Sequence, residues 1–377
     1  MRLMKSKIIS VGLISLAIVA CLLFAACDKT KGNKPPVDDF DRKVMLSNIC
    51  NNLILPYYLD FSVKTASLKT MVINFNADPN LNQLETLQKQ FNETAIAWQY
   101  VATYEFGPAQ EIALYANTNT FPTDTANVKK NIANGTYNLA TASNIASKGL
   151  PAIDFLLYGA ANTDTEIVAL YKTGGLQKNY QNYLLDLVTE IDNHANFVYN
   201  NWNNSYKNEF INNIGNSVGS SLGMLVNQLN YDWEFLKNYQ VGIPLGKKTL
   251  GNALPEKVES YYGGFSSALA KEHQSSIQNL YFGIGKDGIN RAGFDDYLVF
   301  LKTNYNGQLL ADAIKKQFEM VKTSLALVPD PLSEAVINQQ NLVNATYNEM
   351  QKQVVLLKTD LPSALGILIT YQDNDGD

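Results

Sequence analysis

The sequence predicts an all-α protein built from two similar four-helix-bundle-like domains packed side by side. Apolar residues recur at intervals of three or four over most of the chain, which is the spacing of one face of an amphipathic helix. Alternating apolar runs and hairpin dipeptides, which indicate strands, are scarce. The roughly 340 residues after the N-terminal segment exceed what one helical core holds, so two domains are expected.

Two long apolar stripes are the clearest helical signals. The first consists of Leu81, Leu84, Leu87, Phe91, Ala95, Trp98 and Ala102, and the second of Leu176, Tyr180, Leu184, Leu187, Ile191, Val198 and Trp202. Residues at these spacings form one helix face, which buries against neighbouring helices. The same period recurs in residues 207–238, 255–282, 307–326 and 332–358. Long amphipathic helices joined by short Gly, Pro and Asn loops predict antiparallel bundles.

A weak internal repeat suggests where the domains divide. Trp98 precedes Gly107 by nine residues, and Trp233 precedes Gly242 by nine residues. Coincidence explains so short a match equally well. If the repeat is real, residues 42–205 form an N-terminal helical bundle and residues 206–377 form a C-terminal one.

Residues 1–26 have the composition of a lipoprotein signal peptide. Positive charges precede an apolar run, and small residues stand before Cys27. We therefore expect cleavage before Cys27, acylation of its thiol, and a flexible tether over residues 27–41. Two alternatives stay open, namely Cys21 as the acylated residue and an uncleaved apolar segment as a transmembrane anchor. Each of these places the folded part outside the cytoplasm, on the periplasmic face or at the cell surface.

Charge and cysteine content restrict the function further. Loss of residues 1–26 removes three positive charges and takes the net charge from −5 to −8. An acidic chain without a Lys/Arg cluster argues against binding to nucleic acid or to an anionic membrane surface. After cleavage, Cys50 is the only cysteine besides the acylated one, so no intrachain disulfide is expected. Its apolar helical surroundings predict a buried, unreactive thiol.

Several segments in fixed order resemble one known family. The most specific is residues 149–159, Gly-Leu-Pro-Ala-Ile-Asp-Phe-Leu-Leu-Tyr-Gly. The others are Trp98 with residues 105–109, and residues 237–247, 254–262, 293–298 and 373–377. Together they resemble the imelysin family, and in particular imelysin-like lipoproteins of Bacteroidetes-type bacteria. The family signature is Gly-x-His-x-x-Glu, commonly followed by Phe-Leu-Leu-Trp-Gly.

The resemblance implies an all-helical protein with a functional site between two bundle-like domains. The site residues that it implies are Gly149, Pro151, Asp154, Glu105, Trp98 and Gly107. The family was first classed with metallopeptidases and is now more often associated with iron uptake. This chain has Pro151 where the family has His, and Asp154 where the family has Glu. Pro151 cannot coordinate through its side chain, so the metal of the site, if any, stays unknown.

Histidine ligands for a zinc peptidase are scarce. Such an enzyme needs about three protein ligands and a general base, whereas the chain contains two histidines, neither in a His-Glu-x-x-His sequence. His194 lies four residues after Glu190, which favours a solvated helix pair over a shared metal or proton. His273 beside Glu272 is interpreted in the same way. No catalytic residue is assigned.

Asp154 and Glu105 are the acids of the predicted site. Pro151 fits the first turn of a helix, so Asp154 would lie near the helix N-terminus, where the dipole stabilises a negative charge. This structural role and a ligand-facing role both explain an acid at position 154. Glu105 would be a second carboxylate at the interdomain cleft. Paired carboxylates suit a hard cation or ferric iron better than zinc.

These features predict a lipid-anchored, non-enzymatic binding component of iron or haem uptake. Its ligand would be iron or haem, and its partner an uptake receptor, a permease or a haem protein. The alternatives are a metallopeptidase and a structural lipoprotein that holds another envelope protein. Residues 282–286 lack the Ser or Thr of a phosphate loop and are interpreted as a helix-ending loop. Residues 373–377 are interpreted as an acidic tail in preference to a calcium loop.

Overall fold

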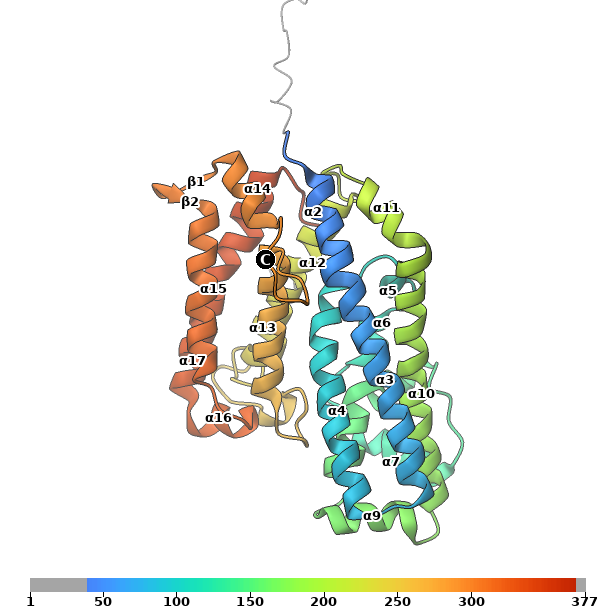
Figure 1. Cartoon of the computed structure of the whole chain (residues 1–377). Coiled ribbons are helices and arrows are strands. Elements are labelled where there is room, and N and C mark those ends of the chain that lie inside the picture. Colours follow the sequence, from blue (N-terminus) through green and yellow to red (C-terminus); the bar gives the residue numbers. More distant parts are fainter. Residues whose placement is uncertain (1–38, 371–377) are drawn as a thin grey trace, which may run out of the picture. The chain divides into compact units, whose positions relative to one another are not determined.

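A computed structural model describes residues 39–370 of the chain. Residues 41–370 belong to one compact unit that is almost entirely helical, as Figure 1 shows. The predicted all-α class is therefore confirmed. The signal peptide, Cys21, Cys27 and the acidic residues 373–377 lie outside the described residues.

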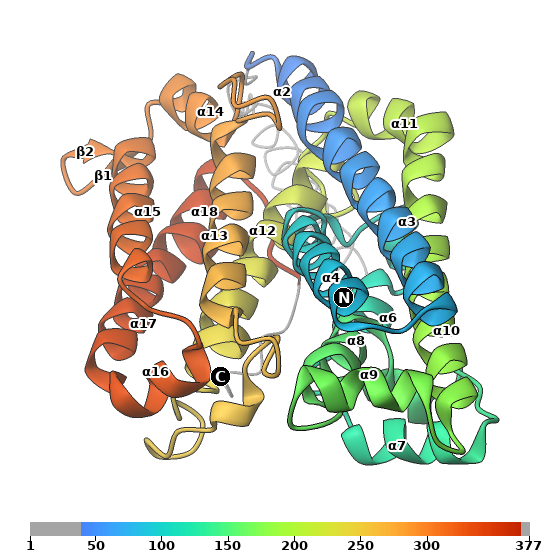
Figure 2. The same ribbon diagram turned by 60° about the horizontal axis from the view of Figure 1, so that its bottom comes forward.

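The first part of the chain contains three long helices and several short ones. In order, the elements are α2 (Arg42–Asn48), η1 (Ile49–Ile54), α3 (Leu55–Ala77), α4 (Leu81–Val101), η2 (Ala102–Tyr104), α5 (Pro108–Glu111), α6 (Leu114–Thr118), α7 (Thr125–Asn134), η3 (Ala142–Ser147), α8 (Gly149–Asp154), η4 (Phe155–Gly159), α9 (Asp164–Lys172), α10 (Gln177–Asn201), η5 (Trp202–Tyr206) and α11 (Lys207–Asn212). Helix α3 packs against both α4 and α10, and α8 packs against α10 (Figure 2).

The later helices form a second packed set. In order, the elements are α12 (Ser221–Phe235), η6 (Leu236–Gly242), η7 (Pro255–Lys257), α13 (Ser266–Phe282), α14 (Phe294–Leu301), β1 (Asn304–Tyr305), β2 (Gln308–Leu309), α15 (Leu310–Ala326), α16 (Leu332–Asn338), α17 (Gln340–Val355), η8 (Leu356–Asp360) and α18 (Leu361–Leu365). Helix α15 packs against α17 and α13, and α13 also packs against α4 of the first set. The predicted boundary at residue 205 falls in η5, and the division into two domains stays a prediction.

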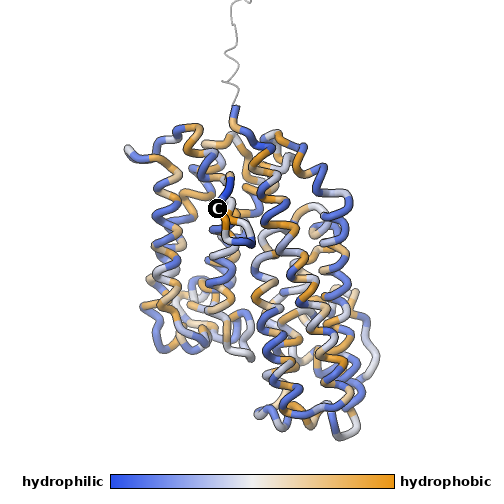
Figure 3. The backbone as a smooth tube through the Cα atoms, viewed as in Figure 1, coloured by the Kyte–Doolittle hydropathy of each residue, from blue (hydrophilic) through white to orange (hydrophobic). Residues whose placement is uncertain are grey.

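Local sequence explains where several helices begin. The Asn80 side chain accepts a hydrogen bond from the Gln83 N–H at 3.0 Å and so caps α4. At α9, Thr163 and Glu166 form a capping box, in which each side chain accepts from the other residue's backbone N–H. Figure 3 shows polar and apolar residues alternating along the helices, as expected for amphipathic segments with one buried face.

The structure departs most clearly from two of the predicted helical segments. Residues 207–238 are interrupted between α11 and α12, and in residues 255–282 the α-helix begins at Ser266. The second difference follows from Pro255 and from the glycines at 263 and 264, which disfavour a continuous helix. The segment between η7 and α13 is thereby free to form part of the site described below.

The core confirms the predicted role of the stripes. Trp98, Trp202 and Trp233 are all fully buried, whereas Leu81 at the start of the first stripe is exposed. Cys50 is buried as predicted and forms no disulfide with any described residue, and burial raises the pKa of its thiol to about 12, which disfavours the reactive thiolate. Among the helices of residues 39–370, none is both long and apolar enough to span a membrane.

Candidate functional site

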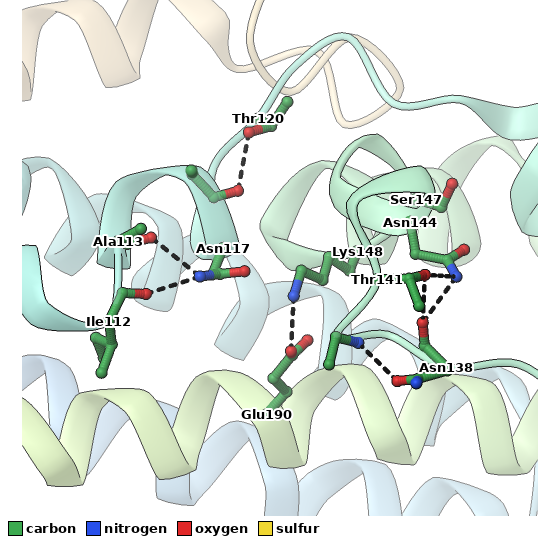
Figure 4. Close-up of polar contacts among 12 residues, drawn as sticks. Ile112, Ala113, Asn117, Thr120, Asn138, Thr141, Asn144, Ser147, Lys148 and Glu190 are labelled. Atoms are coloured by element: carbon green, nitrogen blue, oxygen red, sulfur yellow. Dashed lines mark hydrogen bonds and ion pairs between the residues drawn. The ribbon is translucent and has the colours of Figure 1, made fainter.

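The signature helix α8 is fixed at its start by a buried ion pair. Lys148 directly precedes α8 and is only 3% exposed, and its Nζ lies 2.8 Å from Glu190 Oε1 on α10, as Figure 4 shows. A buried ammonium is tolerated when a carboxylate pairs with it. Glu190 therefore has Lys148 as its ion-pair partner, whereas the spacing in the sequence suggested His194. Burial lowers the pKa of His194, and its Nδ1 has no hydrogen-bond partner among the described residues.

The loops that lead to α8 are held by their own amide side chains (Figure 4). Asn117 Nδ2 donates to the carbonyl of Ile112 at 2.7 Å. Asn144 Nδ2 donates to the carbonyl of Asn138 at 2.9 Å and to Thr141 Oγ1 at 3.1 Å. Such local side-chain bonds satisfy backbone groups that no helix uses, so these loops form a defined support for the site.

Gly149 is required by the close approach of two chain segments. Its φ of 74° lies in the left-handed region, and a Cβ at this position would overlap the carbonyl oxygen of Thr118. The helix begins at Gly149 itself and passes into η4 after Asp154. Asp154 therefore lies at the end of α8, not near its N-terminus, and the predicted stabilisation by the helix dipole does not apply.

Asp154 is instead held by three donors from the segment between η7 and α13. Its Oδ1 accepts from the Ser260 hydroxyl at 2.8 Å and from the Gly263 N–H at 3.0 Å. Its Oδ2 accepts from the Tyr262 N–H at 2.9 Å. The side chain is 2% exposed. A carboxylate has about four acceptor positions, so these contacts leave about one for a ligand.

The surroundings of Asp154 make its ionised form costly. Burial raises the pKa of the carboxyl to about 6, although the bonds from Ser260, Tyr262 and Gly263 act in the opposite direction. The negative charge of Glu259 raises the pKa further. Asp154 is therefore harder to ionise than an exposed aspartate, and a positive charge nearby would favour its ionised form.

Pro151 and Asp154 line one pocket of about 240 Å³. The full lining consists of Phe121, Pro122, Thr123, Pro151, Asp154, Glu256, Lys257, Val258, Ser260, Tyr261 and Tyr262. Most of this wall comes from residues 256–262, which the sequence analysis placed on a helix. The break at Pro255 and Gly263 was the available signal for a loop there.

The other predicted site residues lie elsewhere. Glu105 lines a separate pocket of about 480 Å³ that shares no lining residue with the Asp154 pocket. Gly107 has a φ of 55°, and a Cβ at this position would overlap the Tyr206 ring. Trp98 is buried, with its ring centroid 5.7 Å from that of Phe61 and 5.5 Å from that of Tyr115. The structure thus groups Gly149, Pro151 and Asp154 and places Glu105 apart from them.

A buried polar network lies beside the Asp154 pocket and was not predicted. Glu259, next to Ser260, accepts from Gln99 Nε2 at 2.7 Å and from Asn119 Nδ2 at 2.8 Å, and it also accepts from Gln240. Burial raises the pKa of Glu259, while these donors lower it. The partners are far apart in sequence, so no local pattern indicates the network.

His273 belongs to the same network. Its Nδ1 lies 3.0 Å from Gln240 Oε1, and its Nε2 lies 2.9 Å from Asp232 Oδ2. Glu272, its neighbour in sequence, instead accepts from the Tyr100 hydroxyl at 2.6 Å. Within residues 39–370, no group of three or more His, Cys, Asp or Glu side chains is arranged to hold a metal ion.

Comparison with known proteins gives one family and two similar folds. The profile of the family described as imelysin, peptidase M75, matches residues 54–360. An iron-regulated protein A precursor from Parabacteroides distasonis ATCC 8503 has a similar structure, with a TM-score of 0.71, 15% identity, and coverage of 89% of this chain and 97% of that one. An imelysin-like protein from Psychrobacter arcticum 273-4 has a TM-score of 0.67, 20% identity, and coverage of 88% and 97%. No curated protein matches the chain.

Proposed function

Since this chain belongs to the imelysin family, we propose that it is a non-enzymatic binding protein of an iron uptake system. Its ligand site is the pocket that Pro151 and Asp154 line. The observation that carries the proposal is that these two signature positions, which lie three residues apart, line the same pocket. One protein of similar structure, described as an iron-regulated protein A precursor, supports a role connected with iron.

Export and a lipid anchor are part of the same proposal. The N-terminal charges, the apolar run and Cys27 have the order that a lipoprotein signal peptide requires. The Parabacteroides distasonis protein is described as a precursor, which is consistent with export. The anchored protein would receive its ligand from, or pass it to, an uptake receptor, a permease or a haem protein of the cell envelope.

The chemistry of the pocket favours a hard cation with oxygen ligands. Asp154 and Glu256 supply carboxylates, and Tyr261 and Tyr262 supply phenol groups, whereas the lining contains no imidazole or thiol. Carboxylate and other oxygen ligands suit hard ions, in contrast to the nitrogen and sulfur that zinc prefers. Glu256 is therefore the second carboxylate of the pocket, in the role that the sequence analysis gave to Glu105.

The size of the pocket favours a small ligand. Its volume of about 240 Å³ is below the ~300–1,000 Å³ of sites that enclose drug-sized molecules. Ferric iron held by a small oxygen-rich chelator fits this space better than haem does. Lys257 also lines the pocket and offers a positive charge to the carboxylates of such a chelator.

The test is a calorimetric titration of the purified full chain with ferric citrate and, separately, with haemin. We expect saturable binding of ferric citrate. Because Glu256 is exposed, the Glu256→Gln variant should fold normally, and loss of a charged ligand should weaken binding by about tenfold or more. The matched control is Glu85→Gln, which changes an exposed glutamate on α4 and should leave the affinity unchanged.

Three results would overturn the proposal. They are an absence of ferric citrate binding at millimolar concentration, equal binding by the Glu256→Gln variant, and cleavage of a peptide mixture that a chelator abolishes. The third result would support the metallopeptidase alternative, which rests on the family's classification. If haemin binds and ferric citrate does not, the ligand is haem and not ferric iron held by a small chelator.

A further inference from the structure

The pocket that contains Glu105 has the features of a second ligand site. It has a volume of about 480 Å³, twice that of the Asp154 pocket. Its lining consists of Glu105, Phe106, Gln110, Tyr115, Ala116, Val218, Met224, Asn227, Gln228, Tyr231 and Thr370. Glu105 is the one carboxylic acid in this lining, and the lining contains no Lys, Arg or His.

Glu105 is largely buried, and only neutral backbone N–H groups, those of Tyr115 and Leu114, stabilise its charge. Both of its carboxylate oxygens accept from the same backbone N–H, that of Tyr115, each at 3.1 Å. No basic side chain of residues 39–370 forms an ion pair with it. Burial raises the pKa of the carboxyl to about 7 and the negative charge of Asp232 adds to this effect, although the backbone N–H groups of Tyr115 and Leu114 act in the opposite direction. A buried acid without a positive partner destabilises the fold in its ionised form.

The rest of the lining is suited to an organic cation. Phe106, Tyr115 and Tyr231 contribute aromatic rings, and Met224 contributes a thioether. Aromatic faces attract ammonium groups through the quadrupole of the ring. Gln228 lines the same pocket, and its amide nitrogen has no acceptor within the described part of the chain. A second polar group on the ligand, an oxygen acceptor, would satisfy that nitrogen.

A metal ion fits this pocket less well. Hard cations take about six or more oxygen ligands, usually from several carboxylates, and this lining offers one carboxylate. The other oxygen-bearing side chains of the lining, among them Gln110, Asn227 and Gln228, are neutral and would leave most of a multivalent charge unbalanced. A ligand with one ammonium group on an apolar body can form an ion pair with Glu105 and also pack against the apolar residues of the lining.

We propose that the Glu105 pocket binds a small organic cation, whose primary ammonium group pairs with the Glu105 carboxylate and contacts the rings of Phe106, Tyr115 and Tyr231. The site is distinct from the proposed iron site, because the two pockets share no lining residue. The protein thus has one pocket for a hard cation and another for an organic cation.

The test compares two probes of nearly equal shape, phenethylammonium and the neutral 2-phenylethanol. Each is titrated calorimetrically into the full chain at about pH 8, above the pKa of Glu105, so that the carboxylate is ionised. We expect phenethylammonium to bind at low millimolar concentration or better, and at least about tenfold more tightly than 2-phenylethanol. Glu105→Gln should lose most of this difference, whereas Glu256→Gln in the other pocket should keep it.

Thermal melting of Glu105→Gln shows whether the variant is folded, and Glu105→Asp provides a second variant. Asp keeps the negative charge, but its side chain is one methylene shorter. The affinity for phenethylammonium should therefore fall, while the preference for phenethylammonium over 2-phenylethanol should persist. The proposal is overturned if phenethylammonium does not bind in the millimolar range, if both probes bind equally, or if Glu105→Gln binds as well as the native chain. Failure of ferric citrate to bind leaves these results unaffected, so the two proposals are tested separately.

Discussion

The hydroxyl of Ser260 donates a hydrogen bond to Asp154 Oδ1 at 2.8 Å and joins residues that lie 106 positions apart in the chain. With the N–H groups of Tyr262 and Gly263, it connects the end of α8 to the segment that follows η7. The acid of the signature is therefore a structural link as well as a lining residue of the pocket. A change at Asp154 alters both roles together, which makes Glu256 the better position for testing binding.

Gly263→Ala should destabilise the protein through this link. A Cβ at position 263 would lie 2.5 Å from the Phe265 ring and 2.7 Å from Asp154 Oδ1, closer than van der Waals contact allows in both cases. The loop or the carboxylate must move, and overpacking of a buried contact typically costs about 1–3 kcal/mol. Chemical denaturation of the two proteins measures the difference.

Gly175→Ala is the matched control for that experiment. A Cβ at position 175 meets no atom within 4 Å, and the residue is exposed. The same chemical change there should alter the free energy of unfolding by less than about 1 kcal/mol. Equal effects of the two substitutions would show that the contact between Gly263 and Asp154 is not tightly packed.

Glu105→Gln should stabilise the protein at high pH and not at low pH. The pKa of Glu105 is raised to about 7 in the folded chain, against about 4.3 in an unfolded one. The folded state therefore binds the proton more tightly, and stability falls as the pH rises from about 4 through about 7. Gln does not titrate and still accepts from the Tyr115 N–H, so the variant should be more stable by roughly 1–3 kcal/mol at about pH 8.

Urea denaturation at about pH 4 and about pH 8 checks this prediction, since the difference between the two proteins should nearly vanish at the lower pH. The pKa of Asp154 is also raised, so Asp154 contributes to the pH dependence of the free energy of unfolding. It contributes equally in the two proteins, so its effect cancels when they are compared. A variant that is less stable than the native chain at pH 8 would contradict it. It would indicate that Glu105 has a stabilising contact when ionised.

Helical periodicity was sufficient to predict much of the fold. The stripe from Leu81 to Ala102 corresponds closely to α4, because a long amphipathic segment has few alternatives to burying one face. The same reasoning failed for residues 255–265, where helical spacing of apolar residues coexists with Pro255 and two adjacent glycines. Backbone restrictions at these residues outweighed the periodicity.

The arrangement of the site was less predictable. The resemblance led to Asp154, but the donors that hold it come from Ser260, Tyr262 and Gly263, which no spacing in the sequence connects to it. The sequence could assign Glu105 and Asp154 to one site but could not place them together, and they line different pockets. Contacts between distant segments depend on tertiary packing, which a single sequence does not reveal.

Trp98→Ala and Trp233→Ala should each lower the free energy of unfolding by about 3–5 kcal/mol. Both rings are fully buried, and Trp233 Nε1 also donates to the Met350 carbonyl at 3.1 Å. Phe197→Ala, which truncates an aromatic residue that is 39% exposed on α10, is the comparison and should cost much less. Calorimetry measures the melting temperatures of the three variants. An equal decrease in all three would contradict the assignment of Trp98 and Trp233 to the core.

Cys27→Ser should abolish acylation, because a serine hydroxyl cannot form the thioether bond to the lipid. Metabolic labelling with a fatty acid analogue measures the modification in cells. Cys21→Ser is the control and should retain the label. If the label persists in Cys27→Ser and disappears in Cys21→Ser, the acylation site is Cys21.

Pro151→His should create a zinc site that the native chain lacks. Positions 151 and 154 are three residues apart on α8 and both line the pocket with Glu256, so an imidazole at 151 would share a helix face with Asp154. Imidazole nitrogen is a preferred zinc ligand, whereas the native lining offers oxygen alone. We expect the native protein to contain no stoichiometric zinc after purification, and the variant to bind zinc at least about tenfold more tightly in equilibrium dialysis.

Pro151→Ala separates this effect from loss of the proline ring, since it adds no ligand and should not gain affinity. Equal zinc binding by the native protein and the His variant would mean that the side chain at 151 does not reach the site. Stoichiometric zinc in the native protein would contradict the assignment of this pocket to a hard cation with oxygen ligands.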